Sequence, residues 1–244
     1  MYLSKSYAKT RRDFLLKSGR HTPSQIAHDS QLLFFLTMKV ILVNGSPHKN
    51  GCTHTALNEI AKELHAQGIE TEEFWCGTKP VMGCIGCGRC KDTKQCWYAE
   101  DGVNEFLCKV PEADAFVFGT PIHFAGTSGS IKPFMDRAFC SKMDIYAGKL
   151  GAAIVSCRRG GAQGGFEDLN RYFMIANMPV VSSNYWNEVH GNTPDEVMQD
   201  VEGMQTMRTL GKNMAWLLKC VEAGKQAGVN FPEHEAKVRT NFIR

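Results

Sequence analysis

Apolar and polar residues follow two periods along this chain. Short continuous apolar runs, such as KVILV at residues 39–43, are typical of strands that are covered on both faces of a parallel sheet. Segments with apolar residues at every third or fourth position are typical of helices with one buried face. The runs predict strands over residues 39–43, 69–75, 115–120, 150–156 and 179–182. The periodic segments predict helices over residues 56–67, 103–110, 129–142, 166–177 and 195–227, the last one long or broken.

Strands that alternate with helices predict an α/β domain with a single parallel sheet, because a helix carries the chain back between parallel neighbours. Five strands suit the doubly wound, flavodoxin-like order 2-1-3-4-5, with helices on both faces and a ligand at the carboxyl ends of the strands. We assign this domain to residues 38–228. Residues 1–37 form a basic extension that we expect to be disordered, and residues 229–244 form a C-terminal tail.

The net charge of +3 is unevenly distributed. Residues 1–37 carry six Lys or Arg against two Asp, which leaves −1 for the other 207 residues. Such a body has no basic footprint for nucleic acid, and no apolar run approaches the ~20 residues of a membrane span. The pair Arg11-Arg12 resembles a twin-arginine export signal, but polar residues follow it instead of an apolar segment. We therefore expect a cytoplasmic protein that binds neither nucleic acid nor membranes.

Four of the ten cysteines are clustered in the stretch GCIGCGRCKDTKQC, at Cys84, Cys87, Cys90 and Cys96. Thiolates at this spacing favour an iron–sulfur cluster, with a structural zinc ion or free thiols as alternatives. The stretch follows the second predicted strand, so we expect it near the carboxyl edge of the sheet. Four other cysteines lie on apolar stretches, where we expect them to be core residues: Cys108, Cys140, Cys157 and Cys220.

Three loops that follow predicted strands carry candidate chemistry. The first loop, residues 44–53, is rich in hydroxyl groups and precedes a helix, which is typical of an anion site. It matches neither GxGxxG nor GxxxxGK[ST], so a dinucleotide fold or an ATPase loop is not supported. Its hydroxyl groups suit a monophosphate such as that of FMN, and an ordinary strand-to-helix turn with good caps is the alternative. The second loop, residues 119–129, offers flat groups and backbone amides to a ring. The third loop, residues 156–165, has two arginines and four glycines. The glycines would let the backbone come close to a flavin, and the arginines would stabilise its reduced, anionic form.

The stretches KVILVNGSPHKNGCTHTAL and GTPIHFAGTSGSIKPFMDR, with the cysteines between them, resemble the NADPH-dependent FMN reductase superfamily. Within it they most resemble the iron–sulfur flavoproteins, over about residues 38–185. The resemblance implies a flavodoxin-like fold that binds FMN, and a [4Fe–4S] cluster on the four clustered cysteines. It implies that the phosphate is surrounded by Ser46, His48, Cys52 and Thr53. It further implies that the isoalloxazine ring is lined by Pro121, Ile122, His123 and Phe124, and that Gly160 and Gly161 lie at its pyrimidine edge.

These features predict an NAD(P)H-dependent FMN oxidoreductase whose chemistry takes place on the flavin, without a catalytic side chain. Its electrons would pass to a quinone, a nitro or azo compound, or a redox partner protein. The alternative is a non-enzymatic, flavodoxin-like electron carrier. Carriers of that type are usually strongly acidic, so the nearly neutral body favours the enzyme.

The apolar positions of the predicted C-terminal helix indicate a homo-oligomer. They exceed what one domain needs, which favours a homo-oligomer, a dimer or tetramer, that helps to cover the cofactor. The alternative is that the helix only covers its own sheet. The positions at helical spacing are Met207, Leu210, Met214, Leu217 and Leu218.

Overall fold

The computed structural model describes residues 38–242. The chain divides into two units, residues 1–37 and residues 38–244, and every element described below belongs to the second. The predicted basic extension and its Arg11-Arg12 pair lie outside the described residues. Within those residues, no helix is both long and apolar enough to cross a bilayer.

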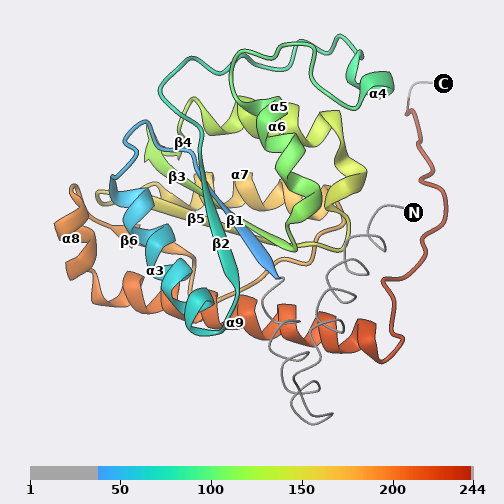
Figure 1. Cartoon of the computed structure of the whole chain (residues 1–244). Coiled ribbons are helices and arrows are strands. Elements are labelled where there is room, and N and C mark those ends of the chain that lie inside the picture. Colours follow the sequence, from blue (N-terminus) through green and yellow to red (C-terminus); the bar gives the residue numbers. More distant parts are fainter. Residues whose placement is uncertain (1–37, 243–244) are drawn as a thin grey trace, which may run out of the picture. The chain divides into compact units, whose positions relative to one another are not determined.

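The sheet has five parallel strands and confirms the predicted order (Figure 1). The parallel strands are β1 (Lys39–Asn44), β2 (Glu70–Trp75), β3 (Ala115–His123), β5 (Leu150–Cys157) and β6 (Glu188–His190). They lie in the order β2-β1-β3-β5-β6, which is 2-1-3-4-5 when the parallel strands alone are counted along the chain. A short strand, β4 (Gly126–Thr127), pairs antiparallel with the end of β3 and makes a hairpin that the apolar pattern did not predict.

The fifth parallel strand does not lie where it was predicted. Residues 179–182 contribute only an isolated bridge between Gly151 and Val180, whereas β6 at residues 188–190 is the strand that pairs with β5. Between the two, the side-chain amide of Asn187 donates to the carbonyl of Ala153 at 3.0 Å. A polar side chain thus takes the place of a strand partner along the edge of β5. The prediction relied on the short apolar run at residues 179–182 and did not identify residues 188–190 as the strand.

Helices cover both faces of the sheet, as predicted. One face carries α3 (Cys52–Ala66), α8 (Pro194–Gln199) and α9 (Val201–Gln226); the other carries α5 (Val103–Lys109), α6 (Ile131–Ser141) and α7 (Ala162–Ile175). Alternation along β1 separates the two cores, since Val40 and Leu42 pack with α3 and α9 while Ile41 and Val43 pack with α5 and α6. Three short helical turns complete the set: α4 (Cys90–Thr93), η1 (Val110–Glu112) and η2 (Met143–Tyr146).

The predicted C-terminal helix is broken at Asp200, whose carboxylate accepts a hydrogen bond from the amide of Gly203 at 3.0 Å and so begins α9. The apolar positions of α9 pack within the chain. Met207, Leu210, Met214 and Leu218 are buried in the core that α9 shares with α3, and Leu217 is half-buried against it. These residues therefore support the alternative, that the helix covers its own domain. The homo-oligomer stays a prediction without support from this helix.

Deletion of residues 1–37 should leave the folded domain intact. The first strand begins at Lys39, and the unit of residues 38–244 contains both cores. We expect the shortened chain to keep its thermal unfolding temperature and the FMN binding that the resemblance implies. A fall of more than a few degrees on calorimetry would contradict this, because it would mean that the extension packs on the domain.

Candidate functional site

The three predicted loops meet at one edge of the sheet, where β1, β3 and β5 end. The backbone amide of Gly45 donates to the carbonyl of Gly119 at 2.8 Å, which joins the first loop to the second. The hydroxyl of Ser128 donates to the carbonyl of Gly45, also at 2.8 Å. The hydroxyls of Thr53 and Ser156 are 2.9 Å apart and join the first loop to the third. The structure thus brings together segments that are more than a hundred residues apart.

The first loop is shaped by its own hydrogen bonds. The amide of Ser46 donates to the side chain of Asn44 at 3.0 Å, and the amide of His48 donates to the hydroxyl of Ser46 at 3.1 Å. The indole of Trp75 on β2 donates to the carbonyl of Ser46 at 2.8 Å. Helix α3 then begins after Gly51, and no side chain caps its first turn. The amides at the start of this 15-residue helix are therefore available to an anion, which the helix dipole also favours.

The predicted phosphate residues take different positions around this helix terminus. Ser46 and Thr53 are buried, with their hydroxyls engaged inside the protein, whereas His48 is exposed. The thiol of Cys52 donates to the carbonyl of Gly191 at 3.7 Å, and burial raises the pKa of this thiol above its ordinary value. Cys52 is therefore a neutral group at physiological pH and brings no negative charge to the anion site.

The second loop contains a strained turn. Phe124 and Ala125 connect β3 to β4, and both have a left-handed backbone, with φ of 51° and 61°. A two-residue hairpin of this kind favours Asn-Gly, and a bulky residue at positive φ costs roughly 1–3 kcal/mol. The turn holds the Phe124 ring fully in solvent, beside the exposed His123. Backbone strain that presents an aromatic ring to solvent at the ligand edge of the sheet indicates a binding function for this turn.

Glycines of the third loop pack against that turn. A Cβ at Gly161, whose φ is +90°, would lie 2.9 Å from the Cα of Ala125, and a Cβ at Gly164 would lie 2.9 Å from its carbonyl oxygen. A Cβ at Gly165 would meet the side chain of Ile122. Gly160, in contrast, has open space around it. The sequence predicted both Gly160 and Gly161 beside the ring; the structure adds that Gly161 lets the first turn of α7 support the hairpin.

The cysteine segment, residues 84–96, forms a second feature. Cys84, Cys87, Cys90 and Cys96 line one pocket against α6. Gly86 and Gly88 have left-handed backbones, with φ of 66° and 73°, which lets the segment turn tightly there. A short helix, α4, forms at residues 90–93 within this predicted loop.

A fifth thiol, that of Cys140 on α6, lines the same pocket. The sequence predicted Cys140, Cys108 and Cys220 as core residues, and all three are exposed; only Cys157 of the predicted set is buried. The three exposed cysteines lie on the outer faces of helices whose apolar stripes point to the core. A cysteine with apolar neighbours in the sequence is therefore exposed when it lies on the outer face of its helix.

The pocket lies further from the first loop than the sequence suggested. A Cβ at Gly45 would lie 2.8 Å from the side chain of Ile131 at the start of α6, whereas Cys140 lies nine residues further along that helix. At 1.5 Å per residue, this places the fifth thiol about 14 Å along the helix axis from the first loop. In Figure 1 the segment with α4 passes over α5 and α6, outside the helical layer. The cysteine segment leaves β2 at the carboxyl edge but does not remain there.

The donor set of this pocket suits an iron–sulfur cluster. Within residues 38–242, no three His, Cys, Asp or Glu side chains converge as a single metal ion requires. The thiolates of a cluster bind separate iron atoms and do not need to converge on one point. The guanidinium of Arg137 also donates to the sulfur of Cys96 at 3.2 Å, which places a positive charge beside a sulfur that would carry negative charge if it bound iron.

Comparison with known proteins identifies the family. The model of the NADPH-dependent FMN reductase family matches residues 38–193. An iron–sulfur flavoprotein of Methanocaldococcus jannaschii is 33% identical over 193 residues, which cover 76% of this chain and 100% of the relative. An iron–sulfur flavoprotein of Archaeoglobus fulgidus is 31% identical over 177 residues, which cover 70% of this chain and 86% of the relative.

Solved structures agree with the fold. A flavodoxin from the domain Archaea aligns over 75% of this chain and 99% of its own, with 17% identity and a TM-score of 0.51. This likeness confirms the predicted flavodoxin-like fold, and the two relatives confirm the resemblance to the iron–sulfur flavoproteins. The chain belongs to the NADPH-dependent FMN reductase family.

Proposed function

We propose that this chain is an FMN-dependent oxidoreductase that oxidises NAD(P)H, and that its four clustered cysteines hold a [4Fe–4S] cluster. The observation that carries the flavin part is the junction of three loops at the carboxyl edge. There the uncapped start of α3 and the strained Phe124-Ala125 turn follow strands that end at the same edge, where both would face a bound flavin. Family membership supports the same chemistry.

The start of α3 would bind the FMN phosphate, because its free amides and dipole favour an anion. Ser46 and Thr53 would shape this site through their buried hydroxyls, while His48 and Cys52 lie at its border. Bound FMN supplies hydride acceptance and onward electron transfer. The chain would orient it: Pro121, Ile122, His123 and Phe124 would lie against the ring, and Gly160 and Gly161 would approach its edge.

The cysteine segment would add a one-electron centre. Cys84, Cys87, Cys90 and Cys96 would be the iron ligands, because their spacing lets one loop supply all four and they line one pocket. Electrons taken from NAD(P)H would be transferred to a quinone, a nitro or azo compound, or a partner protein. We expect no side chain to act as a general base.

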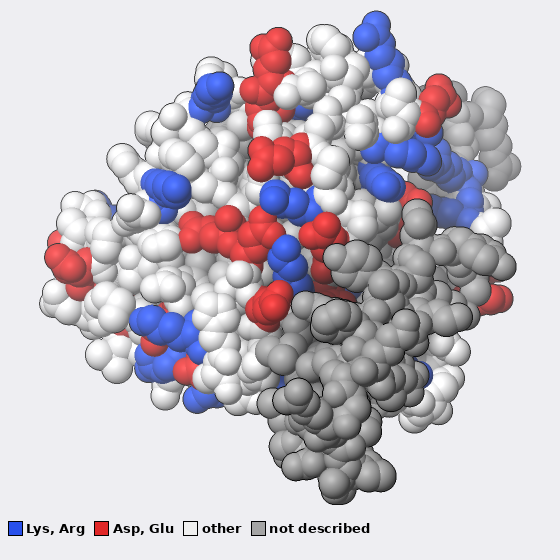
Figure 2. Space-filling model, in the orientation of Figure 1, with Lys and Arg blue, Asp and Glu red and all other residues white. Residues whose placement is uncertain are grey.

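A non-enzymatic electron carrier is the competing function. Figure 2 shows a face on which acidic and basic side chains are interspersed. Ion pairs of the described residues include those of Glu72 with Lys39 and Lys109. Such a face lacks the single-sign field that steers a carrier to its partner. Together with the net charge of −1 on residues 38–244, this face favours the enzyme.

Anaerobic purification followed by flavin, iron and sulfide assays tests the proposal, together with the rates of NADH and NADPH oxidation. We expect one FMN per chain, iron and sulfide in equal amounts, and oxidation of at least one nicotinamide. A chain that takes up no FMN would overturn the proposal. FMN without NAD(P)H oxidation would indicate the carrier, and iron-free protein after reconstitution, with four titratable thiols, would remove the cluster.

Replacement of Thr53 by valine should destabilise the loop junction and weaken FMN binding. The change leaves the buried hydroxyl of Ser156 without its partner, a loss of about 1–3 kcal/mol in the free energy of unfolding. Urea denaturation and flavin titration measure the two effects. Thr209→Val is the matched control, because its exposed hydroxyl bonds only to the carbonyl of Gln205 in its own helix. Equal stability of the two variants would contradict the role of Thr53.

A further inference from the structure

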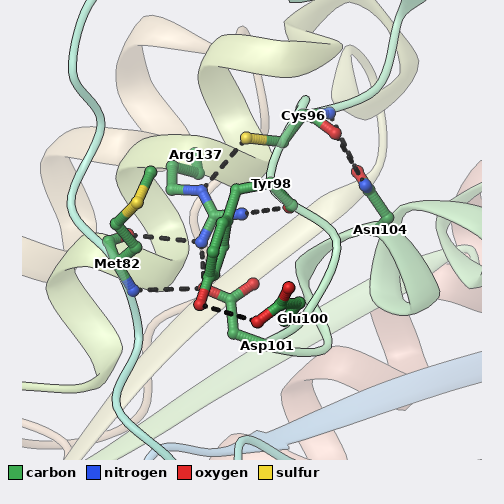
Figure 3. A network of polar contacts seen from close by, with 7 residues as sticks. All are labelled: Met82, Cys96, Tyr98, Glu100, Asp101, Asn104 and Arg137. Carbon is green, nitrogen blue, oxygen red and sulfur yellow. Dashed lines mark hydrogen bonds and ion pairs between the residues drawn. The ribbon is translucent and has the colours of Figure 1, made fainter.

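A buried arginine lies beneath the cysteine segment (Figure 3). The side chain of Arg137 on α6 is 1% exposed and donates through all three of its nitrogens. Its Nε donates to the sulfur of Cys96 at 3.2 Å, and its Nη2 donates to the carbonyl of Tyr98 at 2.7 Å. Its Nη1 donates to the carbonyl of Met82 at 3.2 Å and forms an ion pair with the buried carboxylate of Asp101.

These contacts reach both ends of the cysteine segment. Met82 precedes its first cysteine, and Tyr98 and Asp101 follow its last. The carboxylate of Asp101 also accepts a hydrogen bond from the amide of Met82 at 3.1 Å. One guanidinium–carboxylate pair therefore ties the two ends of the segment to each other and to α6.

Cys96 is held on its other side as well. The side-chain amide of Asn104 accepts a hydrogen bond from the amide of Cys96 at 2.8 Å and donates to its carbonyl at 2.7 Å. The backbone of Cys96 is thus fixed from α5 and its sulfur from α6. Figure 3 shows Asn104 and Arg137 on opposite sides of this cysteine.

A purely structural ion pair would explain only part of this arrangement. A buried guanidinium needs several acceptors to offset its desolvation, and Asp101 with the two carbonyls supplies three. The fourth donor points at sulfur, which is a weak acceptor as a neutral thiol. It becomes a strong, charge-assisted acceptor when the sulfur is a thiolate bound to iron. The fourth contact therefore indicates a role toward a bound cluster.

We propose that Arg137 is the positioning residue of the cysteine segment: it clamps both ends of the segment onto α6 and aims a donor at the sulfur of Cys96, which raises the reduction potential of the cluster. The second half rests on the proposed cluster. Reduction adds one electron to the cluster and no proton, and the guanidinium keeps its charge throughout. A donor beside a ligand sulfur favours the reduced, more negative form.

The clamp is tested in the iron-free protein by hydrogen exchange with mass spectrometry. In Arg137→Met, peptides that cover residues 82–101 should exchange at least about tenfold faster, whereas peptides of β3 should stay protected. Arg171→Met is the matched control, because it removes the same charge from an exposed arginine on α7. Unchanged exchange over residues 82–101 would overturn the clamp. If Arg137→Met unfolds β3 as well, Arg137→Lys, which keeps a charge for Asp101, replaces it and should show the same local loss.

The effect on the cluster is tested by potentiometric titration of the reconstituted protein. Arg137→Lys should lower the ratio of reduced to oxidised cluster at a fixed potential by about tenfold, which is ~59 mV for a one-electron couple. Arg171→Met should leave the potential unchanged. An unchanged potential in Arg137→Lys would overturn this half. A wild-type chain that takes up no iron would overturn the proposed cluster and this half with it, while hydrogen exchange still decides the clamp.

Discussion

Replacement of Cys87 by serine should abolish the visible absorbance of the proposed iron–sulfur cluster while FMN stays bound. A cluster needs all four thiolates, and one loop supplies them, so a single hydroxyl in place of a thiol leaves one iron without its ligand. The first loop lies at the other end of α6 and shares no residue with the cysteine pocket. We therefore expect iron and sulfide to fall to background and the flavin-to-protein ratio to stay constant.

The fifth thiol provides a test within the same pocket. Cys140→Ser should keep its iron, because Cys140 does not belong to the spaced set, and Cys220→Ser on the exposed side of α9 serves as the distant control. Loss of iron in Cys140→Ser, with full iron in one of the four loop variants, would mean that Cys140 is a ligand.

In Cys87→Ser, reduction of bound FMN by NAD(P)H should continue, whereas reduction of a one-electron acceptor should slow. Loss of both activities would contradict the separation of the two centres.

Replacement of Gly161 by alanine should weaken FMN binding by at least about tenfold, which corresponds to ~1.4 kcal/mol. The new Cβ would lie 2.9 Å from the Cα of Ala125, at a residue whose φ is +90°. A strained backbone costs about 1–3 kcal/mol, and backbone atoms of the facing turn cannot move aside as the end of a side chain can. The hairpin that presents Phe124 would therefore shift away from α7. Flavin titration of the flavin-free protein measures the loss.

Gly160→Ala is the matched control for this change. It introduces the same methyl group one residue earlier, where no atom lies within 4 Å and the backbone is not left-handed. The thermal unfolding temperature should fall in Gly161→Ala and stay unchanged in Gly160→Ala. Equal unfolding temperatures would show that α7 does not support the hairpin.

Much of the fold follows from local pattern alone. A parallel strand covered on both faces reads as a continuous apolar run, so KVILV at β1 and the runs at β3 and β5 predicted their strands closely. The alternation with helices then limits the sheet to few orders, and 2-1-3-4-5 is the observed one. The pattern failed at β6, a strand of three residues, because a strand so short has no period of its own.

The candidate site divides in the same way. The cysteine spacing, the hydroxyl-rich first loop and the glycines of the third loop could be recognised as short motifs. The functional groups of each motif lie close together in the sequence. The position of the pocket along α6 could not be predicted from the sequence. It depends on how the cysteine segment packs across α6, a helix that begins more than thirty residues later.

The fold class, the family resemblance and the loops that carry the candidate chemistry could all be predicted from the amino-acid sequence, because they depend on periodicity and on short spacings. Three features became visible only in the folded chain: Cys140 lines the pocket of the clustered cysteines, Arg137 donates to the sulfur of Cys96, and Gly161 packs against the Phe124-Ala125 turn. Each of these is a contact between residues distant in the chain. Such contacts arise when helices pack on a sheet, and no local pattern of apolar and polar residues specifies which side chains then meet.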